Sequence, residues 1–77
     1  MKEQKVRATE QDVHKAIKTI AQECKNPYAL TYVKAAIMLD MTGEELRVQC
    51  LYILSNLTHW RGETARQVKE VLRGFTG

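Results

Sequence analysis

The residue types that most often do chemistry are sparse in this 77-residue sequence, and none of them forms a catalytic motif. His14 and His59 fall on different predicted helices, without a second ligand at the spacing of a metal site. Ser55 lacks the flanking glycines of a nucleophile elbow. The side chains of Glu44 and Glu45 point about 100° apart on a helix, which suits capping better than acid–base catalysis. We therefore expect no enzymatic activity, no metal and no cofactor.

The two cysteines, Cys24 and Cys50, each lie on the apolar stripe of a predicted helix. Small secreted domains usually carry four or more cysteines, and no CxxC pair typical of a zinc site is present. The first residues lack the apolar run of a secretory signal, and no segment approaches the ~20 apolar residues of a membrane span. We therefore expect two free, buried thiols in a cytoplasmic protein that does not act at membranes.

The charge is unevenly distributed along the chain, although the net charge is only +3. Residues 1–8 and residues 61–77 each carry a net charge of +2, and the residues between them sum to about −1. Residues 1–8 are predicted to be a flexible basic tail. Two basic ends can contact nucleic acid, but with a net charge this small they are more typical of a solvated tail and a salt-bridged surface helix.

Apolar residues recur at steps of three and four throughout residues 9–77, and no segment alternates long enough to form a strand. The sequence therefore predicts an all-α, compact four-helix domain. Loops of two to four residues should place neighbouring helices antiparallel or at a steep corner. The predicted helices span about 10–25, 27–40, 43–60 and 63–73.

The first two helices have local start signals. Thr9 with Asp12 three residues later is a variant of the capping box, in which each side chain bonds the other residue's amide. Asn26 precedes Pro27, and proline suits the first position of a helix while disfavouring helical geometry in the residue before it. We therefore expect one helix to end just before Asn26, and this residue to cap the next.

The third helix has the clearest start signal, because Thr42 and Glu45 have capping-box spacing while Met41 and Leu46 have the spacing of a hydrophobic staple. Gly74 is predicted to be the C-cap of the fourth helix.

The second and third helices have more apolar residues than one buried face requires. In a four-helix monomer no helix is enclosed on all sides, so part of this excess should reach the surface and mark an interface. The alternative is that the first and fourth helices cover the pair completely. The candidate interface residues are Tyr28, Tyr32, Met38, Val48, Leu51 and Tyr52.

A second surface is the basic ridge of the fourth helix, which follows the third helix and a glycine-containing turn in the outline of a helix-turn-helix. Glu63 and Glu70 interrupt this ridge and can pair with its cations. The candidate nucleic-acid contacts are Arg61, Arg66, Gln67, Lys69 and Arg73.

No stretch of the sequence identifies a family. The first hypothesis is a non-catalytic association module that forms a homodimer, or binds another protein, through the second and third helices. The alternative is a small DNA-binding or regulatory module that uses the fourth helix.

Overall fold

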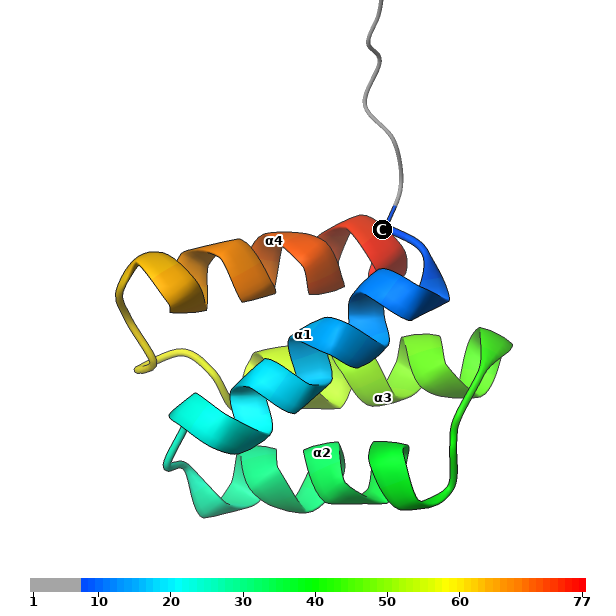
Figure 1. Cartoon of the computed structure of the whole chain (residues 1–77), viewed down its shortest axis with the longest axis horizontal. Coiled ribbons are helices and arrows are strands. Elements are labelled where there is room, and N and C mark those ends of the chain that lie inside the picture. Colours follow the sequence, from blue (N-terminus) through cyan, green and yellow to red (C-terminus); the bar gives the residue numbers. More distant parts are fainter. Residues whose placement is uncertain (1–7) are drawn as a thin grey trace, which may run out of the picture.

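A computed structural model describes residues 8–77, which form four α-helices and, within that range, no strand (Figure 1). The helices are α1 (Glu10–Glu23), α2 (Pro27–Met38), α3 (Gly43–Ser55) and α4 (Glu63–Thr76). The predicted all-α four-helix fold is confirmed. Except for Ala8, the predicted basic tail lies outside the described residues.

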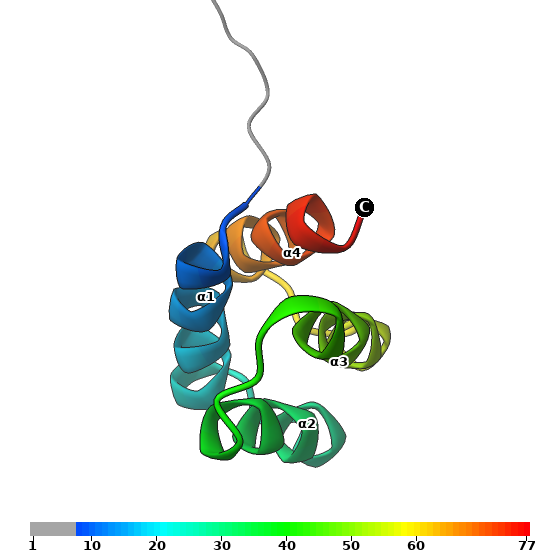
Figure 2. The same cartoon turned by 90° about the vertical axis from the view of Figure 1, so that its right-hand side faces the viewer.

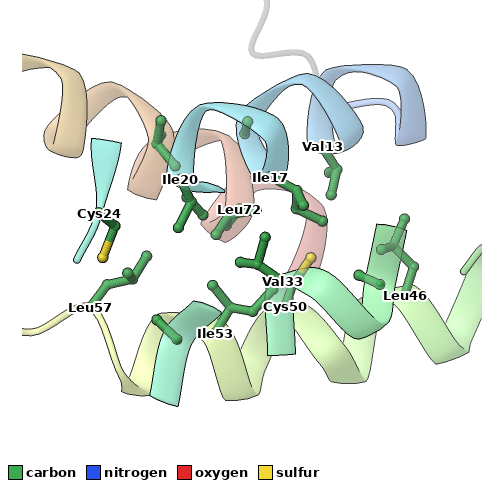
Figure 3. Close-up of a cluster of buried hydrophobic side chains, with 14 of the residues drawn as sticks. Val13, Ile17, Ile20, Cys24, Val33, Leu46, Cys50, Ile53, Leu57 and Leu72 are labelled. Atoms are coloured by element: carbon green, nitrogen blue, oxygen red, sulfur yellow. The ribbon is translucent and has the colours of Figure 1, made fainter. Parts of the chain in front are cut away.

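The four helices form a closed ring in which each packs against two others. α1 packs against α2 and α4, and α3 packs against the same two helices; Figure 2 shows the ring nearly end-on. The core fills its centre, where apolar side chains from all four helices meet (Figure 3). Every helix therefore keeps an outward face, and the character of that face decides what the surface can do. The largest fully buried side chains are Val13, Ile17, Ile20, Val33, Leu46, Cys50, Ile53, Leu57 and Leu72.

The predicted caps of α1 and α2 are confirmed. The Thr9 hydroxyl accepts from the Asp12 amide at 3.1 Å, and the Asp12 carboxylate accepts from the Thr9 amide at 3.1 Å. The Asn26 side-chain oxygen accepts from the amides of Tyr28 at 2.8 Å and Ala29 at 3.2 Å. α1 and α2 each end two residues before the predicted position, a difference within the fraying of helix termini.

The predicted capping box of α3 is wrong, because the Thr42 side chain makes no capping hydrogen bond. A carboxylate from another helix takes its place: Glu10 of α1 accepts from the Gly43 amide at 2.7 Å. An acid suits this position because the N-terminus of a helix carries partial positive charge. Met41 and Leu46 are both buried, as a hydrophobic staple requires.

His14 is not the solvated side chain that its position beside the apolar stripe suggests. It is partly buried, and its Nε2 lies 3.1 Å from the Met41 carbonyl oxygen, to which an Nε2–H donates. Together with Glu10, it fastens α1 to the turn between α2 and α3.

α3 ends at Ser55 rather than near Trp60. The Ser55 hydroxyl and the Asn56 side-chain amide both donate to the Tyr52 carbonyl, at 2.8 and 2.9 Å, and such local bonds compete with helix continuation. The chain then turns through bonds from Leu57 to Leu54 and from Trp60 to Leu57, and Leu57 stays buried. The connection therefore spans residues 56–62, longer than the predicted two to four residues, whereas the connections 24–26 and 39–42 fit that prediction.

α4 continues past Gly74 to Thr76, so the predicted C-cap is also wrong. The Gly77 amide closes the helix on the Arg73 carbonyl at 2.9 Å. Ala8 lies beside Gly74, where a Cβ on residue 74 would be 3.6 Å from the Ala8 nitrogen, an ordinary contact distance, so the packing at this position does not require glycine. Phe75 and Ala8 both pack against the core from this end.

Both cysteines are free and buried, as predicted. Burial raises the pKa of the Cys50 thiol to about 11, from an ordinary value of 9.0. Between these values the unfolded chain loses a proton that the folded chain keeps, so stability falls as the pH rises. We expect the free energy of unfolding to fall by about 2 kcal/mol from pH 9 to pH 11, measured by urea unfolding at several pH values. The stability of Cys50→Ala should depend much less on pH over this range, whereas Cys24→Ala should show the same fall as the native chain. Equal falls in both variants would contradict the attribution of the effect to Cys50.

Candidate protein-interaction surface

One flank of α2 is apolar along its whole length. Tyr28, Tyr32, Ala35 and Leu39 follow one another at steps of four, three and four residues, which places them in one row along the helix. The ring of Tyr32 stacks on that of Tyr52, with 5.5 Å between the ring centroids and 23° between their planes. The row therefore borders α3, and the stacked pair joins the two helices at their outer edge.

The outward face of α3 continues this apolar row. Val48, Leu51, Tyr52 and Ser55 have the spacing i, i+3, i+4, i+7, and they point away from the buried side of the helix. Leu51 is 44% exposed and Tyr52 is 50% exposed, while Val48 is partly buried. Three large side chains thus occupy a face that a polar row would normally cover.

The α2–α3 surface, as we name it, contains the six predicted interface residues and one that the prediction missed. Tyr28 is 72% exposed and Met38 is 83% exposed, so α1 and α4 do not cover the pair completely and that alternative is wrong. The missed residue is Leu39, which is 66% exposed and could have been found from its spacing to Tyr32 and Ala35. The surface comprises Tyr28, Tyr32, Met38, Leu39, Val48, Leu51 and Tyr52.

Few polar interactions lie beside the α2–α3 surface. The Gln49 side chain donates to the Tyr32 carbonyl at 2.9 Å and ties the two helices together. At the first turn of α3, Glu44 accepts a hydrogen bond from Arg47 Nε at 2.9 Å, and both side chains of this pair are exposed. The hydrogen bond from Arg47 lowers the pKa of Glu44, and the same bond raises the pKa of Arg47. Both groups stay charged at neutral pH.

Acidic residues of α4 itself pair with much of the predicted basic ridge. Arg66 lies 2.6 Å from Glu63 and 3.5 Å from Glu70, and Gln67 also donates to Glu63, at 3.1 Å. Exposed pairs of this kind contribute only tenths of a kcal/mol each to stability, but they neutralise the field that a phosphate backbone would meet.

The remaining cations of the predicted ridge do not form one continuous patch. Lys69 Nζ donates to the Trp60 carbonyl at 2.6 Å, where it is partly buried and ties α4 to the connection before it. Arg61 and Arg73 are exposed at opposite ends of α4. The seven residues from 56 to 62 also exceed the three- or four-residue turn of a helix-turn-helix.

No family model, curated protein or solved structure matches the chain. The chemistry of its surfaces therefore carries the functional interpretation. Among the helices of residues 8–77, none is both long and apolar enough to cross a membrane.

A hollow with a volume of about 290 Å³ lies where the α1–α2 and α3–α4 connections meet. Cys24, Trp60 and the exposed His59 contribute to its wall. In the described part of the chain, no group of three or more His, Cys, Asp or Glu side chains is placed to hold a metal ion. The hollow is lined by Glu23, Cys24, Lys25, Asn26, Asn56, His59 and Trp60.

Proposed function

We propose that this protein is a non-catalytic association module that pairs with a second copy of itself through the α2–α3 surface. The observation that carries the proposal is the Tyr32–Tyr52 stack, because it joins two helices into one apolar face while leaving Tyr52 half exposed. A contiguous exposed apolar face on a small domain usually marks an interaction site, and tyrosine and methionine are enriched at the centres of interfaces.

The chemistry of the surface supports a protein partner over a polar one. Tyrosine presents a large rigid area at low entropic cost, and truncating such a residue at an interface centre often costs 2 kcal/mol or more of binding free energy. A two-fold pair needs only one self-complementary patch, which a face of tyrosine and leucine side chains provides. The proposal places the protein in the cytoplasm, where Cys24 and Cys50 would stay reduced, and it involves no cofactor.

Sedimentation equilibrium at micromolar concentrations tests this proposal. We expect the native chain to show a mass twice its 8.9 kDa in a concentration-dependent manner. Tyr52→Glu should give a monomer at the same concentrations, because pairing would then bury an unpaired carboxylate. Its helical circular dichroism should match that of the native chain, because Tyr52 is only half buried.

A matched control puts the same charge on a helix outside the α2–α3 surface. Thr64 is exposed on α4, so Thr64→Glu should leave the pair intact. A native chain that remains at 8.9 kDa up to high micromolar concentration would overturn the proposal, and so would equal dissociation of both variants.

Nucleic-acid binding by α4 remains the weaker alternative. The bonds of Arg66 and Gln67 to acids of α4 and the bond of Lys69 to the Trp60 carbonyl disfavour it, because three of the five predicted contacts already have protein partners. No observation on α4 favours it over self-association.

A further inference from the structure

The charged residues at the two ends of the α2–α3 pair have opposite net sign. At one end, residues 40–47 hold Asp40, Glu44 and Glu45 against Arg47, three carboxylates against one guanidinium, for a net charge of −2. At the other end, residues 23–26 and 56–62 hold Lys25 and Arg61 against Glu23, for a net charge of +1. Figure 1 shows the α2–α3 turn at one end of these helices and both other connections at the opposite end.

Two limiting arrangements bring the α2–α3 surfaces of two copies face to face about a two-fold axis, and they differ in the charges that meet. With the axis along the helices, α3 lies over the partner's α2 and the two acidic ends coincide. With the axis across the helices, α3 lies antiparallel over the partner's α3, and each acidic end meets a basic end. Like charges facing one another oppose association, whereas complementary ends favour it and fix the orientation.

We propose that the two copies pair antiparallel, α3 against α3 and α2 against α2, with the acidic α2–α3 turn of each copy over the basic end of the other. The inference rests on the proposed self-association through the α2–α3 surface. The two-fold axis then crosses near the middle of α3, where Val48 and Leu51 lie on the outward face. Val48 of one copy therefore packs on Leu51 of the second copy, and the reverse contact forms by symmetry.

Cross-linking between single-cysteine positions at the two ends of α3 tests this orientation. Glu44 and Ser55 are both exposed and stand eleven residues apart, which separates them by about 16 Å along the helix. We expect a short bismaleimide to join Glu44→Cys to Ser55→Cys in a mixture of the two variants. The yield should be several times that of either variant alone.

The native chain is the control, because Cys24 and Cys50 are buried and should react with the reagent only slowly. A yield that is higher for Glu44→Cys alone than for the mixture would overturn the antiparallel arrangement and support the one with coinciding acidic ends. Sedimentation of the same samples separates the two hypotheses: a monomer contradicts self-association, whereas a dimer with the wrong cross-links contradicts only the orientation.

The salt dependence of dissociation gives an independent second readout. Raising sodium chloride from about 0.05 M to about 0.5 M shortens the screening length from roughly 14 Å to 4 Å. The dissociation constant should rise several-fold if complementary ends meet. A several-fold fall over this range would instead show that charge repulsion between the two copies dominates, and it would count against the proposal.

Discussion

Leu46→Ala is expected to lower the free energy of unfolding by about 2–5 kcal/mol. Leu46 is fully buried at the first turn of α3 and belongs to the same core cluster as Met41. The substitution removes apolar contacts and leaves a cavity in a core that is thin for its size. A domain of 77 residues has a total stability of roughly 4–12 kcal/mol, so a large share of it would be lost. Urea unfolding followed by circular dichroism measures the change.

Leu51→Ala is the matched control, because it makes the same change on the outward face of the same helix. Leu51 is nearly half exposed, so we expect a loss below about 1 kcal/mol at a concentration too low for the proposed pairing. Equal losses for the two leucines would contradict the orientation of α3.

The second large effect is expected at Asn26, whose side chain joins two connections of the ring. Its oxygen caps α2 through the amides of Tyr28 and Ala29, and its Nδ2 donates to the Asn56 carbonyl at 2.9 Å. Asn26→Ala removes these bonds and leaves two helix amides and one carbonyl without their partner. We expect a loss of about 2–3 kcal/mol in the free energy of unfolding, measured by thermal or urea denaturation.

Asn26→Asp separates the two roles of this side chain. Aspartate keeps the oxygen that caps α2, and its negative charge suits the helix N-terminus, but it cannot donate to the Asn56 carbonyl. We expect a loss of about 1 kcal/mol, smaller than that of Asn26→Ala. If the two variants lose the same stability, the cap contributes little and the bond to Asn56 carries the effect.

The features that could be predicted from sequence are those with local causes. Thr9 with Asp12 and Asn26 before Pro27 each act within four residues, and both caps form as their spacing predicts. The excess of apolar residues on α2 and α3 also predicts exposed tyrosines, because a ring of four helices leaves each one an outward face.

The features that could not be predicted depend on contacts between distant residues. Glu10 caps α3 from 33 residues away, and His14 reaches the Met41 carbonyl over 27 residues, so no local pattern signals either contact. The end of α3 could not be predicted for another reason. Leu57 stays buried after the helix ends, so the helical spacing of apolar residues continues through the turn. Asn56 was a usable signal, because asparagine often occurs where helices end.

Ala8 lies beside Gly74, so the two ends of the described chain are close together on the α1–α4 side of the ring. This side is opposite the pair formed by α2 and α3 (Figure 2). A fluorescent protein or affinity tag fused directly to Ala8 or to Gly77 would therefore project from the far side, leaving the tyrosines uncovered. Two such fusions on one chain would sit next to each other, so the domain can serve as a hairpin-like junction within a longer polypeptide.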